Sequence, residues 1–454
     1  MLFVSMKFPF FLGAVVAAFF LLPPKWRSLV LLFASCLFCL WIEPEVLVIL
    51  LFVSVITWAV AILIDQSNKK GQRITAKICL VLTIGLFVAL LLFYKSVGMS
   101  FYLFQAIGYL TDVYRGKSGA EHNFGYVICY FAFFPKFISG PIERKDKLIP
   151  QLKALERVKF WDRGRLSTAF TYLLWGYFMK MVVADRLVMT VNQIFGNPAQ
   201  FDSFWLIVGA VLYTVQIYCD FAGYSYIAIG CAKIFGINLT HNFETPYMAS
   251  SISEFWRRWH ISLSTWLKDY LYIPMGGNRN GLLRKCINLI IVFGVCGIWH
   301  GTGANFLFWG MLHGIYSILD AIIKNKGWKI KGGQFFTFIA VTFAWIFFRA
   351  DSLDAALIYI GEMGTSGIHP EVWRQTAEQL QLNAVEIAVL LIGVVLVWMM
   401  DELCSRRQMH LPVLIQQKKN TVRYLIFYLL LFSILIFGIY GPGYHVEQFI
   451  YMKF

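Results

Sequence analysis

One histidine, His300, draws attention because the chain around it carries no charge. Residues 287–319 contain no Asp, Glu, Lys or Arg, and His300 lies there between Trp299 and Gly301. An ionisable side chain at membrane depth is costly, and it usually faces a protein interior or a watery cavity. Such a histidine can remove the proton from a hydroxyl group as its oxygen attacks a thioester or an ester, which contributes roughly 10²–10⁴-fold to the rate. The other interpretation is a core histidine bonded to a backbone carbonyl, and the residues alone do not decide between the two.

The residues that follow His300 favour a cavity. Gly301 and Gly303 permit tight or irregular backbone. Irregular backbone at membrane depth is tolerated only where it is buried in protein or lines a cavity. His313, further along the same uncharged stretch, is expected to be structural or to help position the reacting groups.

A second histidine, His260, lies in a segment that is polar, aromatic and basic at once. Ser251 followed by Glu254 resembles a capping box and predicts that a helix begins there. Large apolar residues then recur at helical spacing: Trp256, Trp259, Leu263, Trp266 and Tyr270. Basic residues lie on the opposite face, so the pattern predicts one amphipathic helix over residues 251–273 in the membrane interface. A simple interfacial anchor explains this pattern, and His260 needs no functional role on that basis alone.

Other kinds of active site have little support in the sequence. It contains no G-x-S-x-G, H-E-x-x-H or phosphate-binding glycine loop. Cys36 and Cys39 form a lone C-x-x-C inside an apolar run, where small core-filling residues are the simpler explanation. We therefore expect no metal site and no bound cofactor.

The elements that hold the histidines are expected to be membrane-spanning helices. Of the 454 residues, 59% are hydrophobic and 14% are charged, whereas a soluble chain carries about 25% charged residues. Candidate spans fall near residues 8–22, 28–42, 45–64, 78–94, 124–140, 166–189, 203–232, 286–300, 305–323, 335–350, 384–400 and 424–441. Because about 20 apolar residues cross the hydrocarbon core as a helix, we expect an all-α bundle with roughly ten true crossings. It would form one membrane domain over residues 1–454.

The charges in the loops predict how the chain is oriented. The net charge is +15, and the basic residues lie in short loops, which indicates attraction to anionic lipid rather than nucleic-acid binding. The first loop holds Lys25 and Arg27, the second is acidic, and the loop at 143–165 is strongly basic. The positive-inside rule then places the N-terminus outside the cytoplasm, together with the tail at 441–454.

Four stretches of the chain carry a resemblance to a known family. They cover residues 134–152, 218–230, 253–279 and 297–314, and the last two are the most specific. The sequence resembles the membrane-bound O-acyltransferase family, in particular the bacterial branch of alginate and peptidoglycan O-acetyltransferases. One departure is Tyr226, where the family often has an acidic residue.

The resemblance implies a helical fold around a central tunnel and assigns roles to residues. His300, in the Trp-His-Gly motif, would be the catalytic histidine, and His260, in the Arg-Arg-Trp-His motif, the second functional histidine. Trp299 and Asn305, with His313, would line the tunnel or position the reactants.

The resemblance also divides the chain into three parts and implies a donor. N-terminal spans at 1–140 would precede a catalytic core at 141–320 and C-terminal spans with the tail at 321–454. The acetyl donor would be a cytoplasmic thioester, most simply acetyl-CoA. Its phosphates could meet four basic residues, which are Arg257, Arg258, Arg279 and Lys285.

The end of the chain suggests a relay across the membrane. Residues 449–454 resemble an aromatic sextet that ends related acetyltransferases, so Tyr451 is a candidate acyl carrier; an aromatic anchor at the membrane surface is the alternative. The resemblance implies a bacterial cytoplasmic membrane and a separate extracytoplasmic, esterase-like acetyltransferase partner. That partner would complete the transfer to hydroxyl groups of an exported polysaccharide.

Several other functions stay open at this point. A lipid acyltransferase or a D-alanyltransferase of the same family would use the same histidine. A transporter of polysaccharide precursors would explain the spans but predicts charged residues on facing helices and repeat symmetry, and no repeat is visible. A scaffold for polysaccharide export would leave His300 without a role.

Overall fold

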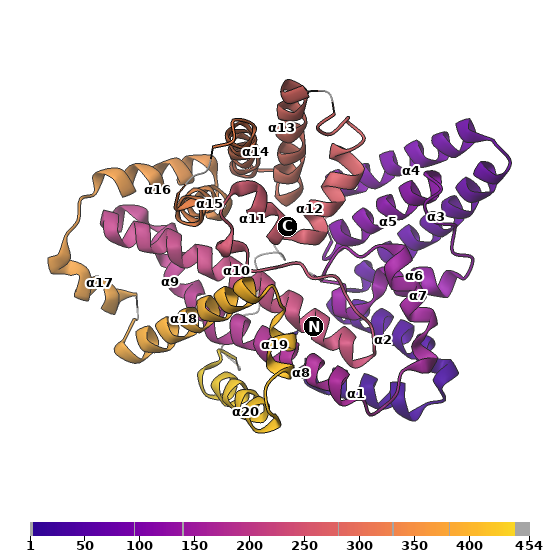
Figure 1. Ribbon diagram of the computed structural model, residues 1–454, viewed down its shortest axis with the longest axis horizontal. Coiled ribbons are helices and arrows are strands. Elements are labelled where there is room, and N and C mark those ends of the chain that lie inside the picture. The colour runs from indigo at the N-terminus through magenta and orange to yellow at the C-terminus, as the bar shows by residue number, and fades with distance from the viewer. Residues whose placement is uncertain are drawn as a thin grey trace. The chain divides into compact units, whose positions relative to one another are not determined.

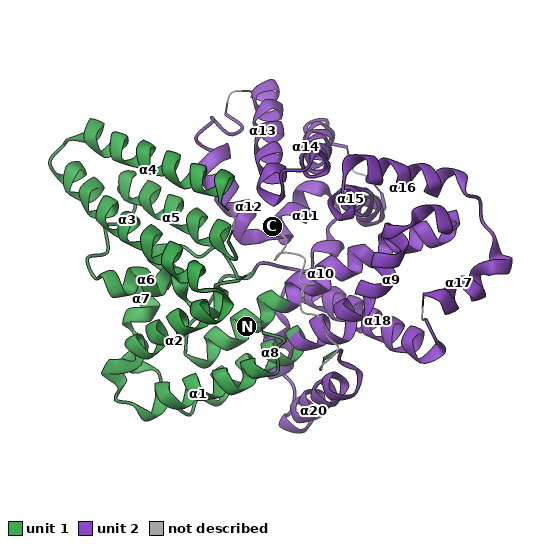
Figure 2. Cartoon of the chain, turned by 180° about the vertical axis from the view of Figure 1, so that it is seen from behind, with its two compact units in different colours: residues 1–176, 224–241, 440–454 green, residues 177–223, 242–439 purple. Residues whose placement is uncertain are grey.

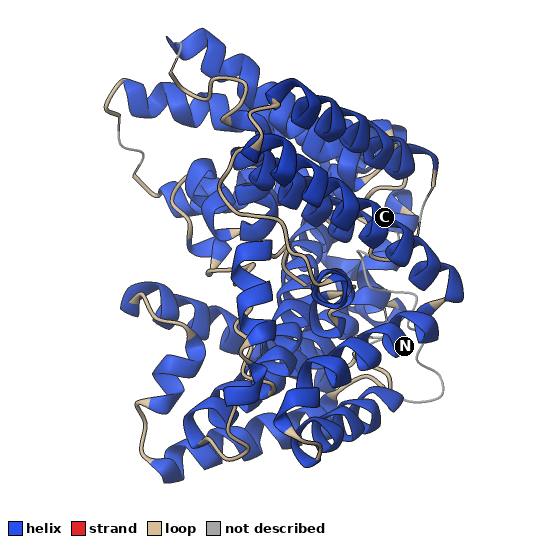
Figure 3. Cartoon of the chain, turned by 90° about the vertical axis from the view of Figure 1, so that its right-hand side faces the viewer, coloured by secondary structure: helices blue, strands red, loops and turns tan. Residues whose placement is uncertain are grey.

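A computed structural model of the chain describes residues 3–94, 96–138, 140–279, 281–328, 331–380 and 382–440. Within these ranges the ordered elements are helices and no residue lies in a strand, as Figure 3 shows. The all-α prediction is therefore confirmed for the described chain. Tyr451 and the rest of the tail at 441–454 lie outside the described residues.

The described chain forms two compact units, which Figure 2 shows in different colours. Within the described chain, unit 1 comprises residues 3–176, 224–241 and 440. Its helices are α1 (Lys7–Leu21), α2 (Arg27–Ile42), α3 (Pro44–Lys69), α4 (Arg73–Phe93), α5 (Met99–Tyr114), α6 (Phe124–Ala132), α7 (Lys145–Lys153) and nearly all of α8 (Arg163–Tyr177). Helix α3 packs against α4, α5 and α6. The sequence did not predict α5, which is buried on almost every face.

A buried arginine of unit 1 holds a loop in place by hydrogen bonds. Arg27, at the start of α2, is buried, and its guanidinium donates hydrogen bonds to the carbonyls of Leu155 (3.1 Å), Glu156 (3.2 Å) and Val158 (2.7 Å). Hydrogen bonds from a charged donor are among the stronger ones in proteins. Arg27 thus satisfies backbone carbonyls of the predicted basic loop.

Unit 2 comprises residues 177–223 and 242–439 and contains both histidine motifs. Its helices are the π-helical segment Phe178–Ala184, α9 (Asp185–Gly196), the first two thirds of α10 (Ser203–Ile234), α11 (Ile252–Arg258), α12 (Ile261–Leu267), the π-helical segment Lys268–Tyr272, α13 (Gly281–His300), α14 (Ala304–Asn325), α15 (Gly333–Arg349), α16 (Leu353–Thr365), α17 (Trp373–Gln379), α18 (Ala384–Arg407), α19 (Leu411–Gln416) and α20 (Asn420–Phe437). Helix α10 ends in unit 1.

Eight described helices are long and apolar enough to cross a membrane. They are Pro24–Ile42, Pro44–Lys69, Arg73–Phe93, Ser203–Ile234, Gly281–His300, Ala304–Asn325, Ala384–Arg407 and Asn420–Phe437, and each matches a predicted span. Three further predicted spans correspond to shorter apolar helices, which are Lys7–Leu21, Phe124–Lys136 and Gly333–Arg349. The predicted span at 166–189 covers α8, a π-helical segment and the start of α9. The chain is a multi-pass helical membrane protein.

The prediction of one continuous amphipathic helix over 251–273 is wrong. Helix α11 ends at Arg258, α12 begins at Ile261, and a π-helical segment follows at Lys268–Tyr272. Between the two helices, His260 adopts a left-handed backbone conformation, with φ 42° and ψ 53°. Such a conformation is uncommon for residues other than glycine and interrupts a right-handed helix. The predicted start is confirmed, because the Ser251 hydroxyl caps the helix by accepting from the amide of Glu254 at 3.3 Å.

Helices α13 and α14 pack closely side by side, as Figures 1 and 2 both show. Glycines make this approach possible. A Cβ atom added at Gly297 would collide with the backbone of Phe306, and one added at Gly310 would collide with the carbonyl of Phe293. Small residues allow helix backbones to approach closely inside membranes. The positions of side chains on α13 and α14 are therefore fixed relative to one another.

Candidate active site

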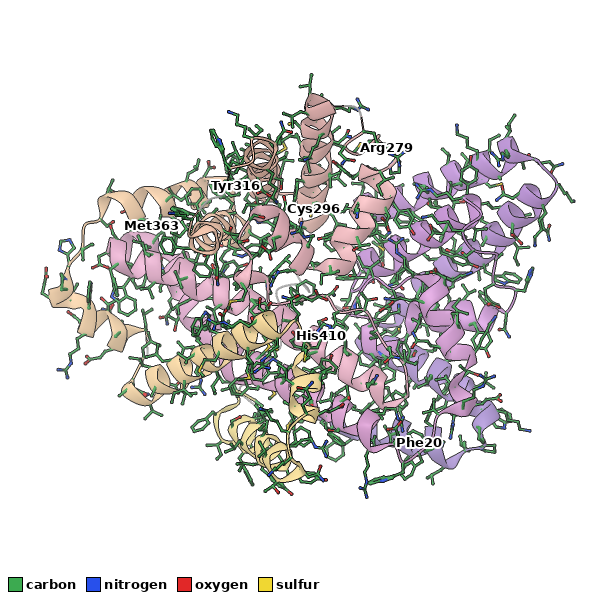
Figure 4. The ribbon with its side chains drawn as sticks, in the orientation of Figure 1. Phe20, Arg279, Cys296, Tyr316, Met363 and His410 are labelled. Atoms are coloured by element: carbon green, nitrogen blue, oxygen red, sulfur yellow. The ribbon has the colours of Figure 1, made fainter. Side chains whose placement is uncertain are left out.

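His300 is the last residue of α13 and is buried, with 3% of its surface exposed. Three aromatic rings pack on its imidazole, with centroids at 4.6 Å for Trp299, 5.1 Å for Trp309 and 5.1 Å for Phe348. Trp309 and Phe348 meet the imidazole nearly edge-on, at interplanar angles of 89° and 75°. Figure 4 labels Cys296, which lies one helical turn before His300 on the same helix. The imidazole thus lies within an aromatic enclosure inside the protein.

His260 is also fully buried, and the break between α11 and α12 places it. Asn242 holds this break, because its backbone carbonyl accepts from the amide of Ile261 at 3.0 Å and its side chain accepts from the amide of Ser262 at 3.3 Å. The ring of Phe221 meets the His260 imidazole edge-on at 4.8 Å. Burial lowers the pKa of His260 to about 3, because the imidazolium loses its hydration there. The ring is therefore neutral at physiological pH.

Trp299 lies against both histidines. Its ring centroid is 6.1 Å from that of His260 and 4.6 Å from that of His300. The structure therefore brings together the two residues that the sequence singled out, although they lie 40 positions apart along the chain. Their predicted catalytic roles stay predictions.

His313 on α14 is completely buried, and its ring packs against Trp309, which also packs against His300. The Trp309 ring centroid is 5.1 Å from each of the two imidazoles. The Trp256 indole N–H donates to Nδ1 of His313 at 3.3 Å. When Nδ1 of a neutral imidazole accepts, the proton resides on Nε2, so Trp256 sets the tautomer of His313. This contact agrees with a positioning role and does not place His313 against the His300 ring.

Asn305 connects two helices of the site. Its side-chain amide donates to the carbonyls of Phe347 at 3.3 Å and Ala350 at 2.9 Å, at the end of α15. Asn305 is buried near the start of α14. Asn305, which was predicted to line the tunnel or to position the reactants, thus links α14 to α15.

The four predicted donor-binding residues differ in their surroundings. Arg258 is half-buried, and its guanidinium contacts Glu254 Oε1 at 2.7 Å, Thr245 Oγ1 at 3.0 Å and Ser405 Oγ at 3.2 Å. Arg257 and Arg279 are exposed, and Lys285 is partly exposed. Figure 4 labels Arg279 in the turn that precedes α13. Their assignment to the donor phosphates stays a prediction.

Sequence reasoning missed a charged cluster in unit 2. Nζ of Lys180 lies 2.6 Å from a carboxylate oxygen of Asp185 and 2.6 Å from one of Asp220, and all three side chains are buried. Two carboxylates and one ammonium meet there. A lysine inside the apolar segment Phe178–Ala184 was the available signal, because ionisable residues at membrane depth are rarely without a role. Trp309 and Phe348 carry no such signal in the sequence, because they look like ordinary core residues.

Known proteins match this chain over most of its length. The model of the MBOAT, membrane-bound O-acyltransferase family, matches residues 117–325, which include both histidines. A probable alginate O-acetylase AlgI of Pseudomonas putida is 33% identical over 428 residues, which cover 86% of this chain and 84% of that protein. A peptidoglycan O-acetyltransferase of Helicobacter pylori is 30% identical over 414 residues, covering 79% of this chain and 78% of that protein. A teichoic acid D-alanyltransferase of Bacillus subtilis is 24% identical over 271 residues, covering 55% of this chain and 66% of that protein.

These matches agree with the four motif stretches and with the helical membrane architecture. The family consists of acyl-transferring enzymes, and the relatives with the higher identities are named as O-acetylating enzymes. The chain is an acyltransferase and belongs to the membrane-bound O-acyltransferase family.

Proposed function

We propose that this enzyme transfers acetyl groups toward hydroxyl groups of an exported polysaccharide, with His300 as the general base. The observation that carries the proposal is the position of His300, which is buried at the end of a span free of Asp and Glu, where the ring of Trp299 lies against both His300 and a second buried histidine, His260. The names of the relatives that act on alginate and peptidoglycan support the choice of acetyl group and acceptor.

The proposed reaction starts from a cytoplasmic thioester, acetyl-CoA. The hydroxyl oxygen of the acceptor attacks the carbonyl carbon of the thioester, and a C–O bond forms. The C–S bond breaks, and the thiolate of coenzyme A leaves. The hydroxyl proton passes to a ring nitrogen of His300 and from there to the thiolate. A buried, neutral imidazole suits this step because its nitrogen lone pair can accept the proton.

His260 is proposed to position the reacting groups through Trp299, whose ring lies against both imidazoles. The enclosure of tryptophan and phenylalanine rings would exclude water, which limits hydrolysis of the thioester. Arg257, Arg258, Arg279 and Lys285 are the basic residues proposed to meet the donor phosphates.

The proposed setting is a bacterial cytoplasmic membrane with both chain ends outside the cytoplasm. The basic loops support this orientation through the positive-inside rule. An esterase-like, extracytoplasmic partner would accept the acetyl group and complete its transfer to the polymer. Tyr451 is the proposed carrier between the two proteins. Mass spectrometry of the C-terminal peptide, from enzyme supplied with donor and without partner, should find acetyl-Tyr451; its absence would remove the carrier from the proposal.

The proposal is tested by polymer acetylation in cells that lack the native gene. Cells complemented with the His300→Ala variant should lose polymer acetyl ester by roughly 10²–10⁴-fold, the usual contribution of a general base. The variant must be present in the membrane at the wild-type level. His122→Ala is a matched control, because His122 is exposed and, among the described residues, its hydrogen bond is made by the backbone carbonyl, which accepts from Trp58.

Each alternative function predicts a different result. Full acetylation by the His300→Ala variant would contradict a catalytic histidine and favour a transporter or a scaffold. A D-alanyl ester in place of an acetyl ester, identified by its mass, would move the enzyme to the D-alanyl branch. An ester on lipid rather than on polymer would indicate a lipid acyltransferase.

A further inference from the structure

We infer that Trp309 and Phe348 together limit the transferred acyl group to two carbons. This acyl-length gauge rests on the proposed function, since it concerns the donor that reacts beside His300. Both rings contact the His300 imidazole directly, with centroids at 5.1 Å, and both are buried. They come from two different helices, α14 and α15, and in this inference they stop the acyl chain of a donor that reacts at His300.

Neighbouring rings hold Trp309 in place. It stacks on Trp345 at 5.6 Å and 18°, and it meets the ring of Phe348 at 5.0 Å and that of His313 at 5.1 Å. None of the Trp309 side chain is exposed. In a close-packed interior a side chain of this size cannot change its rotamer unless its neighbours also move.

Phe348 is supported from behind in the same way. Its ring meets that of Phe306 at 5.4 Å and that of Trp345 at 5.3 Å. Phe306 belongs to α14, whereas Trp345 lies on the same helix as Phe348. The Phe348 ring, which packs on His300, therefore has no empty space behind it into which it could move.

The backbones that carry these side chains are also fixed. Gly297 and Gly310 leave no room between α13 and α14, so the gap between His300 and Trp309 is set by direct contact of the two helices. Asn305 ties the start of α14 to the carbonyls of Phe347 and Ala350 at the end of α15. The gap between His300 and Phe348 is thereby set as well.

Two rings that cannot move aside should discriminate between acyl groups by length. An acetyl group places one methyl group beyond the reacting carbonyl carbon, whereas a butyryl group places two further methylenes there. One methylene in a hydrophobic pocket changes the specificity of an enzyme by roughly 10–200-fold. Two methylenes in a space that cannot expand should exclude butyryl thioesters almost completely.

The test is a competition between acetyl-CoA and butyryl-CoA. The purified full chain, in lipid nanodiscs, receives an equimolar mixture, and mass spectrometry follows the consumption of each thioester. Wild type should consume acetyl-CoA almost alone. Phe348→Ala should raise the ratio of butyryl-CoA to acetyl-CoA consumption by about tenfold or more, and Trp309→Phe should raise it to a smaller extent. A ratio is independent of the amount of active protein.

The chain offers a matched control one residue away. Phe347 is the same residue type on the same helix and is equally buried, but its ring meets Phe308 and Phe343. Phe347→Ala keeps the backbone carbonyl that Asn305 contacts and should leave the ratio unchanged. If Phe348→Ala is inactive toward both donors, the smaller change Phe348→Leu takes its place, with a shift in the same direction.

The possible outcomes separate the gauge from the function on which it rests. An unchanged ratio in Phe348→Leu and Trp309→Phe, with acetyl-CoA still consumed, would overturn the gauge and leave the proposed function intact. An equal shift in Phe347→Ala would also overturn it, because the change would then reflect general loosening. A wild-type chain that consumes neither thioester, even with acceptor present, would contradict the proposed donor and the gauge with it.

Discussion

Two buried regions of unit 2 treat ionisable side chains in opposite ways. Lys180 is paired with groups of opposite charge, because a carboxylate oxygen of Asp185 and one of Asp220 each lie 2.6 Å from its ammonium nitrogen. Around His260 and His300 the packing is aromatic, and burial keeps His260 neutral. Permanent charges inside a membrane protein need partners of opposite sign. An imidazole can instead be buried neutral, and in that form it can accept a proton. The ion cluster therefore suits a structural task, and the histidine pair suits a chemical one.

The largest expected effect comes from removing the charge of Lys180, and it is an effect on stability. Lys180→Met leaves two buried carboxylates without their cation, and the free energy of unfolding should fall by about 3–5 kcal/mol. Chemical unfolding in detergent micelles, followed by tryptophan fluorescence, measures this change. Lys180→Met combined with Asp185→Asn and Asp220→Asn should recover most of the loss, because no unpaired charge remains. A loss below about 1 kcal/mol in the single variant would show that the cluster does not hold the fold together.

The next largest effect is the pH dependence of stability that arises from His260. The unfolded chain protonates His260 below about pH 6.5, whereas the folded protein does not do so until about pH 3. The unfolded state then binds more protons, so the stability from neutral His260 is complete above pH 6.5 and is lost as the pH falls. Between pH 7.5 and pH 5 this loss should be about 2 kcal/mol.

The measurement compares unfolding curves of wild type and His260→Asn at both pH values. Asparagine suits the control because it tolerates the left-handed backbone better than most residues. Wild type should lose about 2 kcal/mol more than the variant on acidification. Equal losses would show that His260 is not the group that titrates, and its description as a neutral buried ring would then be wrong.

The smallest expected effect concerns the hydrogen bond to His313. Trp256→Phe keeps an aromatic ring but removes the N–H that donates to Nδ1 of His313, which should cost about 1 kcal/mol. A double-mutant cycle measures this contact: in a His313→Leu background, the same Trp256→Phe change should cost close to nothing. Equal costs in both backgrounds would mean that the energy comes from packing alone.

The sequence predicted the features that depend on composition over long stretches. Most of the spans are present because apolar runs of sufficient length have few alternatives in a membrane. The importance of His300 could be recognised because no charge lies near it in the sequence. Its proximity to His260 could be expected only from the family resemblance, since helical periodicity carries no information across 40 positions.

Other features could not be predicted, for physical reasons. Helix α5 contains Gln105, Thr111 and Asp112, so it does not resemble a span, and it is buried against protein instead. The break at His260 depends on a single left-handed residue held by Asn242, and the helical periodicity on either side of it stays intact. The partners of Lys180 cannot be identified from spacing, because Asp220 lies 40 positions away.

The length of α10 has a consequence for how the enzyme sits in the bilayer. At 1.5 Å per residue, its 32 residues make an axis of about 48 Å. Even at a tilt of 40°, the upper end of the usual range, this axis spans about 37 Å along the membrane normal, against about 30 Å of hydrocarbon. The ends of α10 must therefore reach the headgroups. Asp202 caps the amide of Trp205 at one end, and Lys233 lies in the last turn at the other.

Hydrophobic mismatch acts on helices that face lipid, whereas most of α10 is covered by protein. Changes in bilayer thickness should therefore act first on the shorter helices that are exposed to lipid.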